Sequence, residues 1–188
     1  MGNSGMSEKK LEKFQILGKK LEHQGRILDF YSYEMLVPNG NHTRWDVIEH
    51  KGAAAVVPVD QEGKIILVRQ YRGAIDDFLL EIPAGGRDST EEDFAVCAAR
   101  ELEEEIGYRC ENLCHLVDYH SAAAYTSEKI GIYYAENLIP ATQHLDENEF
   151  VQIERYTLPE LVELIARGEI TDGKTIAAIM AYKVLRGK

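Results

Sequence analysis

Cysteine is scarce in this sequence, which has only Cys97, Cys110 and Cys114 among 188 residues. Cys110 and Cys114 are four residues apart, but no second Cys pair or Cys/His pair accompanies them as a metal site would require. Free thiols are typical of a reducing cytosol, so we expect a cytoplasmic protein without a disulfide framework. Long hydrophobic runs are also missing. None approaches the roughly 20 residues of a membrane span, the N-terminus has no signal-peptide pattern, and we expect no membrane partner.

Basic residues are also scarce relative to acidic ones. Lys and Arg number 21 against 32 Asp and Glu, which gives a formal net charge of −11 at pH 7. Nonspecific binding to nucleic acid needs a basic surface, so we expect no nucleic-acid partner. A phosphate-bearing substrate is not excluded, because bound metal ions invert the local charge of an acidic site.

The hydrophobic pattern predicts an α+β fold with one full-sized core. Residues 1–10 are expected to form a disordered tail, residues 11–50 a small N-terminal antiparallel β unit, and residues 51–188 the main domain. The β unit is expected to contain strands at 26–37 and 43–49, joined by a hairpin turn at 38–41. The expected strands of the main domain are 52–59, 64–72, 78–82, 114–120, 130–135 and 150–156. Two later helices are expected, one at 161–166 with Thr157 as its candidate N-cap and one at about 175–185.

Residues 86–108 predict a longer helix that begins after turn residues. Asp88, Ser89 and Thr90 are the expected N-cap candidates, and Gly107 is the expected C-terminal stop. The predicted apolar stripe repeats at helical spacing and consists of Ala95, Ala99, Leu102 and Ile106.

Glu101 and Glu105 are four residues apart and share another face of this helix, with Glu104 beside them. Stacked carboxylates repel one another, so the helix gains nothing from them alone. A divalent cation changes that balance, and clustered hard oxygen ligands suit Mg²⁺ or Mn²⁺. Taken alone, a glutamate-rich helix is more often a solvated acidic face.

The fixed positions Gly86, Glu92, Arg100-Glu101-Leu102, Glu104-Glu105 and Gly107 together resemble the box of the Nudix hydrolases. Tyr108 departs from the family, which usually has an aliphatic residue there. The resemblance implies an α/β/α sandwich around a mixed sheet, and metal-dependent hydrolysis of a pyrophosphate with Mg²⁺ as cofactor and Mn²⁺ as the alternative.

Flanking segments are similar to the ADP-ribose pyrophosphatase branch of that family. These segments are residues 69–72, 81–85, 126–128 and 172–175. The similarity implies hydrolysis of ADP-ribose, or a related nucleoside diphosphate sugar, to AMP and ribose 5-phosphate. It also implies a homodimer whose N-terminal β units exchange partners.

The same resemblance implies a set of metal ligands, namely the Ala84 carbonyl and the carboxylates of Glu101, Glu105 and Glu104. Arg100 cannot act as a base, and we expect it to orient Glu92 or Glu104 by a charge-assisted hydrogen bond. Glu128 lies in a loop of small residues and is the expected general base, with Glu104 and Glu105 as alternatives.

The expected substrate-binding residues are Trp45, Arg44, Arg72, Glu81, Gly86 and Tyr31. Trp45 is expected to stack on adenine, or else to pack within the β unit, and Tyr31 is a weaker second stacking partner. Arg72 is suited to a phosphate fork, or else to a structural pair with Glu81. The remaining candidates, His50, His115 and His120, form no clear ligand set and are interpreted as structural or incidental.

Three alternative functions stay open. The substrate could be GDP-mannose or a dinucleotide cofactor, since the box does not specify the base. A non-catalytic regulator that binds ADP-ribose is disfavoured by the intact box and the absence of a basic appended domain. A hydrolase of damaged nucleoside triphosphates is disfavoured by the presence of the N-terminal unit and of the segment Gln70-Tyr71-Arg72.

Overall fold

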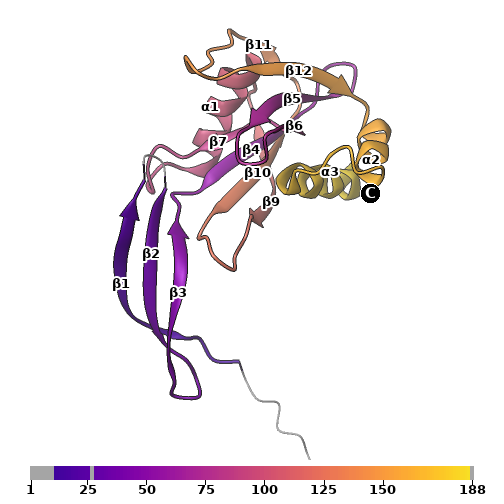
Figure 1. The fold of residues 1–188 in the computed structure, drawn as a ribbon. Coiled ribbons are helices and arrows are strands. Elements are labelled where there is room, and N and C mark those ends of the chain that lie inside the picture. The colour runs from indigo at the N-terminus through magenta and orange to yellow at the C-terminus, as the bar shows by residue number, and fades with distance from the viewer. Residues whose placement is uncertain (1–10, 26–27, 187–188) are drawn as a thin grey trace, which may run out of the picture. The chain divides into compact units, whose positions relative to one another are not determined.

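The computed structural model describes residues 11–25 and 28–186, so the tail predicted at 1–10 lies outside the described residues. The chain divides into two compact units (Figure 1). The first runs to Glu49 and includes residues 124–126, and the second begins at His50 and contains the rest. The division falls one residue before the boundary expected at residue 50.

The first unit is a three-stranded antiparallel sheet in the order β1 (Gln15–Gln24), β2 (Asp29–Leu36) and β3 (His42–Glu49). The predicted turn joins β2 to β3, with Gly40 at φ 85° and its N–H bonded to the Val37 carbonyl at 2.9 Å. Strand β1 was not predicted as a separate element.

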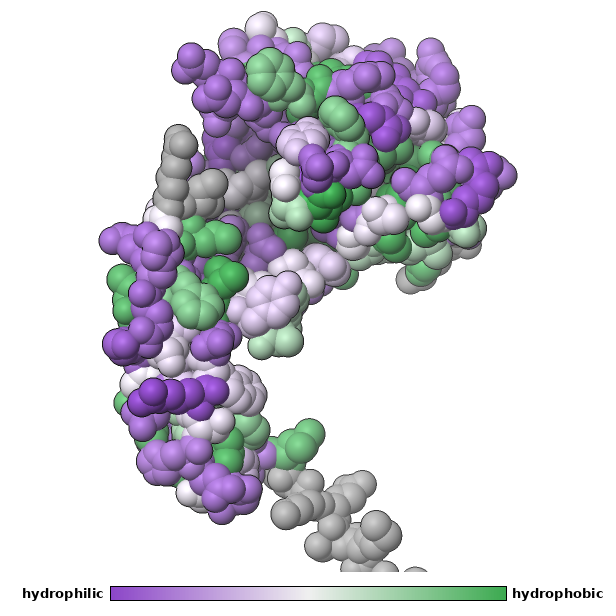
Figure 2. Space-filling view, in the orientation of Figure 1, coloured by the Kyte–Doolittle hydropathy of each residue, from purple (hydrophilic) through white to green (hydrophobic). Residues whose placement is uncertain are grey.

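Large apolar side chains lie exposed on these strands and on the residues directly before them, and Figure 2 shows hydrophobic residues interspersed with hydrophilic ones in this unit. They are Phe14, Ile16, Leu17, Leu21, Leu28, Phe30 and Trp45. Met35 is the one buried apolar side chain among the described residues of β1 to β3. A three-stranded sheet with so little core is marginal by itself.

The second unit contains two principal sheets. One has the order β7 (Ala84–Gly86), β4 (Ala53–Pro58), β10 (Lys129–Ala135) and β9 (Leu113–His120), with β4 parallel to β10 and the other pairs antiparallel. The other is antiparallel, in the order β12 (Val151–Tyr156), β5 (Ile65–Arg72) and β6 (Asp77–Glu81). Short strands β8 (Tyr108–Arg109) and β11 (Ile139–Pro140) pair with each other. The mixed sheet and the six expected main-domain strands are confirmed.

Helices cover both faces of the central strands. Successive β4 residues point to opposite faces, and all six are buried. Ala54 and Val56 pack in one cluster with Leu102 of α1 (Phe94–Ile106). Ala55 and Val57 belong to another cluster, with side chains of α2 (Leu158–Ala166) and α3 (Gly173–Arg186). The predicted α/β/α sandwich is therefore confirmed (Figure 1).

Helix α1 begins later than predicted. Its N-cap is Asp93, whose Oδ1 accepts a hydrogen bond from the Ala95 N–H at 2.7 Å, so the candidates Asp88, Ser89 and Thr90 were wrong. The Asp88 N–H instead donates to the Glu92 carboxylate at 2.7 Å, which holds these residues in a turn before the helix. The predicted stop at Gly107 is confirmed, with φ 69°.

The buried face of α1 also differs from the predicted stripe. Ala99 is exposed and Ala95 is only partly buried. The buried residues are Cys97, Ala98, Glu101, Leu102, Glu105 and Ile106. The two glutamates thus face the interior of the unit, a placement that apolar spacing alone does not predict.

The two later helices extend beyond their predicted limits. Thr157 caps α2 in a capping box with Glu160, as its position in the sequence predicts. Helix α3 begins at Gly173, two residues before the predicted start. In the described part of the chain, no helix has the length and apolar character needed to cross a membrane.

Candidate active site

Strand β7 is the centre of the candidate site. Its backbone pairs with β4, and Ala84, Gly85 and Gly86 line two neighbouring cavities of 390 Å³ and 330 Å³. The larger, which we call the acidic cavity, is further lined by Asp88, Arg100, Glu101, Glu104, Glu105, His144, Asp146 and Glu149. The smaller, which we call the basic cavity, is further lined by Arg72, Lys174, Asp172, Gly173, Tyr119, Ser121, His50, Ala53, Ile130 and Glu128.

Two of the four carboxylates of α1, those of Glu101 and Glu105, are buried in an environment that opposes their ionisation. Glu105 is 3% exposed and Glu101 is 7% exposed. Burial raises the pKa of Glu105 to about 8, and the charges of Glu101 and Glu149 add to that rise. Burial also raises the pKa of Glu101 to about 7, although Arg100 opposes the rise. A cation between these carboxylates would remove the penalty, because it stabilises their charged forms.

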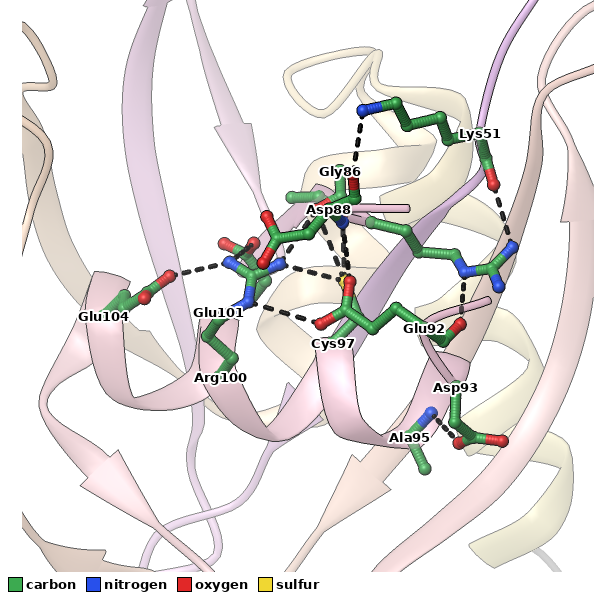
Figure 3. A network of polar contacts seen from close by, with 12 residues as sticks. Lys51, Gly86, Asp88, Glu92, Asp93, Ala95, Cys97, Arg100, Glu101 and Glu104 are labelled. Atoms are coloured by element: carbon green, nitrogen blue, oxygen red, sulfur yellow. Dashed lines mark hydrogen bonds and ion pairs between the residues drawn. The ribbon is translucent and has the colours of Figure 1, made fainter. Parts of the chain in front are cut away.

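The guanidinium of Arg100 organises this cluster (Figure 3). Its Nη1 donates to Glu101 Oε1 at 2.6 Å and to Glu104 Oε2 at 2.8 Å, and its Nη2 donates to the Gly86 carbonyl at 2.9 Å. Glu92 Oε1 lies 3.5 Å from Nε, which is buried and has no hydrogen-bond partner among the described residues. Arg100 therefore contacts Glu92 and Glu104, the two glutamates that it was expected to orient, and Glu101 in addition.

The residues present fit a hard divalent cation. Glu101 and Glu105 offer carboxylate oxygens, and the Ala84 N–H orients Glu105 by donating to its Oε2 at 3.1 Å. A Cβ on Gly85 would lie 2.2 Å from the Glu101 carboxylate, so only glycine leaves room for it. No group of three or more His, Cys, Asp or Glu side chains within 11–25 and 28–186 is placed to hold a metal unaided. Backbone oxygen and water would have to complete the coordination.

Arg72 lines the basic cavity and forms a bidentate ion pair with Glu81. Arg72 Nε and Nη2 donate to the two Glu81 oxygens at 2.6 and 2.7 Å. Glu81 is 1% exposed. Its burial opposes ionisation, but Arg72 and Lys174 outweigh that effect and lower its pKa. Arg72 thus forms the structural pair with Glu81 that the sequence offered as one interpretation. It also lines the cavity, and its role in binding a phosphate stays a prediction. The Glu81 carboxylate faces these two cations.

Glu128 lines the basic cavity and is not among the residues that line the acidic cavity. Its Oε1 lies 3.7 Å from His50 Nε2. His50 Nδ1 accepts the Gly52 N–H at 3.0 Å, so the proton of a neutral His50 is on Nε2 and faces Glu128. His50, interpreted from the sequence as structural or incidental, is a lining residue beside the predicted base.

Glu149 was not singled out in the sequence analysis. It lines the acidic cavity, and its carboxylate accepts a hydrogen bond from Gln70 Nε2 at 3.0 Å. The loop before β12 contains several acidic residues at no regular spacing, so the sequence contains no signal that selects this one. His144 and Asp146 of the same loop also line the cavity.

Trp45, Tyr31 and Arg44 lie in the N-terminal unit. The Trp45 ring is 5.4 Å from the Phe14 ring, centroid to centroid, and the residue remains 45% exposed. Arg44 and Trp45 are adjacent in β3 and therefore point to opposite faces of the sheet. Their parts in substrate binding, and that of Tyr31, stay predictions.

Comparison with known proteins agrees with this arrangement. The NUDIX domain model matches residues 49–179. The ADP-ribose pyrophosphatase of Bacillus subtilis is 35% identical over 176 residues, covering 93% of this chain and 91% of that protein. The methanol dehydrogenase activator of Bacillus methanolicus is 36% identical over 157 residues, covering 82% and 84%. The crystal structure of an ADP compounds hydrolase superposes with a TM-score of 0.82 at 25% identity, covering 95% of this chain and 97% of that one. The chain belongs to the Nudix family.

Proposed function

We propose that this protein hydrolyses the pyrophosphate bond of ADP-ribose to AMP and ribose 5-phosphate. The proposal depends on one observation, which is that β7 lines two neighbouring cavities of different character. The buried carboxylates of Glu101 and Glu105 line the acidic cavity beside β7, and Arg72 lines the basic cavity beside the same strand. A diphosphate needs this combination of cation-binding oxygens and a basic group. The similarity to the ADP-ribose pyrophosphatase of Bacillus subtilis supports the choice of substrate.

Hydrolases of this family generally depend on divalent metal ions, and we propose Mg²⁺, with Mn²⁺ as the alternative. Glu101, Glu105, Glu104 and the Ala84 carbonyl are the proposed ligands. A divalent cation held by these groups would neutralise charge on the nonbridging oxygens of the diphosphate and make the attacking water more acidic. The chain's own part is orientation: Arg100 holds Glu101 and Glu104, and the Ala84 N–H holds Glu105.

The proton acceptor is assigned to Glu128, with Glu104 and Glu105 as the earlier alternatives. The position of Glu149 in the acidic cavity adds a fourth candidate. Conservative variants separate Glu128 from Glu149, because Gln keeps the shape of the side chain and cannot accept the proton. We expect Glu128→Gln to lower kcat by about 100-fold or more and to abolish the acidic limb of the pH–rate profile. If Glu149→Gln has that effect and Glu128→Gln does not, Glu149 is the base.

For the N-terminal unit we propose a role in adenine binding by Trp45, with Tyr31 and Arg44 assisting, and in homodimer formation by exchange of the β unit. The exposed apolar side chains of this sheet support the second role. Sedimentation of the protein at micromolar concentration should give a dimer, and a monomer would contradict it. We further propose a cytoplasmic location, where the three cysteines stay reduced.

The decisive test measures phosphate release in an assay coupled to a phosphatase. The panel contains ADP-ribose, GDP-mannose, UDP-glucose, NADH, diadenosine polyphosphates and 8-oxo-dGTP, each with Mg²⁺ and with chelator. We expect metal-dependent preference for ADP-ribose. Preference for another sugar nucleotide would keep the site chemistry and discard the substrate. Binding of ADP-ribose without turnover would favour a regulatory role.

A further inference from the structure

Four charged side chains form a continuous chain of contacts along the basic cavity. Arg72 donates to both oxygens of Glu81, and Lys174 Nζ also donates to Glu81 Oε2. Lys174 Nζ donates in addition to Asp172 Oδ2 at 3.1 Å. We call Arg72, Glu81, Lys174 and Asp172 the charge chain. Its formal charges sum to zero, with Glu81 and Lys174 the most buried members at 2% and 11% side-chain exposure.

The charge chain is fixed at its far end by the start of α3. Asp172 Oδ2 accepts the Thr175 N–H at 2.9 Å and the Thr175 hydroxyl at 2.6 Å. The Thr175 hydroxyl in turn accepts the Ile82 N–H at 3.0 Å. The residue that follows Glu81 in the chain is therefore tied to the same helix start that holds Lys174. Lys174 has little freedom to move away from Glu81.

Because Lys174 shares the Glu81 carboxylate, it changes the net charge that surrounds the Arg72 guanidinium. Arg72 uses Nε and Nη2 on Glu81, and its side chain remains 40% exposed where it lines the cavity. Without Lys174, the charge chain would have a net charge of −1, and Glu81 Oε2 would lose one of its hydrogen-bond donors. The guanidinium would then face the cavity beside an excess negative charge, which opposes binding of a phosphate group.

We propose that Lys174 is a positioning residue for substrate binding. By sharing the Glu81 carboxylate, it keeps the charge chain neutral and the Arg72 guanidinium oriented toward a phosphate group in the basic cavity. This inference depends on the proposed hydrolysis of a nucleoside diphosphate sugar. It assigns Lys174 an effect through Arg72, not a contact with the substrate.

Steady-state kinetics of Lys174→Met and Lys174→Arg with ADP-ribose and saturating Mg²⁺ test the proposal. Loss of a charged contact is worth about tenfold or more in affinity, so Lys174→Met should raise KM by about tenfold and leave kcat within about threefold. Lys174→Arg keeps the charge and should recover most of the affinity. Lys183→Met, which removes an exposed Lys from the last turn of the same helix, is the matched control and should leave KM unchanged.

A double-mutant cycle with Arg72→Met separates an indirect effect from a direct one. If Lys174 acts through Arg72, Lys174→Met should add little to the KM of the Arg72→Met enzyme. A further rise of about tenfold in that background would overturn the proposal, because it would show a separate contact with substrate. An unchanged KM in both single variants would also overturn it.

A purely structural role for Lys174 predicts a different result. It would lower the thermal midpoint and the amount of folded protein while the KM of the folded fraction stayed at the wild-type value, and that result would contradict the proposal. If Lys174→Met does not fold, Lys174→Gln provides the same KM measurement. Failure of the proposed function is recognised separately, because the wild-type enzyme would then not hydrolyse ADP-ribose.

Discussion

The buried carboxylate of Glu105 should make the metal-free protein less stable as the pH rises. Its pKa is about 8 in the folded protein against an ordinary value of 4.5. Between these values the folded state keeps a proton that the unfolded state has released, so the free energy of unfolding falls with increasing pH. The slope is about 1.4 kcal/mol per pH unit for one proton, or on the order of 3 kcal/mol between about pH 5.5 and about pH 7.5.

The comparison of wild type with Glu105→Gln tests this contribution, because every titrating group except Glu105 is present in both proteins. In chelator, the variant should become more stable relative to wild type by about 3 kcal/mol across that pH range. Urea unfolding followed by far-UV circular dichroism is the suitable assay. The described helices α1 to α3 all lie in the second unit, whereas the single tryptophan, Trp45, lies in the first. Far-UV circular dichroism therefore reports the unfolding of the unit that contains Glu105, which tryptophan fluorescence would not.

Glu103 provides the control on the same helix. Its pKa is lowered by its hydrogen bonds to Arg109, so it is ionised in both states above about pH 5.5. Glu103→Gln should therefore show no divergence from wild type in this range. If wild type and Glu105→Gln lose stability in parallel, Glu105 is ionised in the metal-free protein and the reasoning fails. Added Mg²⁺ at about 100 times its Kd should stabilise wild type by about 2.7 kcal/mol and Glu105→Gln by much less.

Three further predictions concern the local structure. Gly85→Ala should abolish stabilisation by Mg²⁺ in thermal melts, because the added Cβ displaces the Glu101 carboxylate. Gly86→Ala, whose Cβ would meet nothing within 4 Å, should keep that stabilisation. Arg87→Ala should cost about 1–3 kcal/mol in urea unfolding, since Arg87 donates to three backbone carbonyls around the turn before α1. An unchanged midpoint would show that the turn forms without it. Thr157→Ala should cost about 1 kcal/mol by removing the cap of α2, and Thr157→Ser should restore it.

Much of the fold follows from local patterns in the sequence. The apolar run of β4, the stop at Gly107 and the cap at Thr157 each depend on residues within a few positions, and each was predicted correctly. The start of α1 was not, because Asp88 to Thr90 are as good caps as Asp93. The choice between them depends on Glu92 and Arg87, which hold the preceding residues in a turn.

The candidate site, like the fold, could be predicted from the sequence only in part. The family, the helix that carries the carboxylates and the type of cation they suit could be predicted from the sequence alone, because these depend on residue types at fixed spacing along one helix. The three-dimensional fold was needed to show that Glu101 and Glu105 are buried, that Glu149 lines the same cavity, and that Lys174 and Arg72 share Glu81. Those contacts join residues up to 93 positions apart, and no local periodicity records which distant side chains meet.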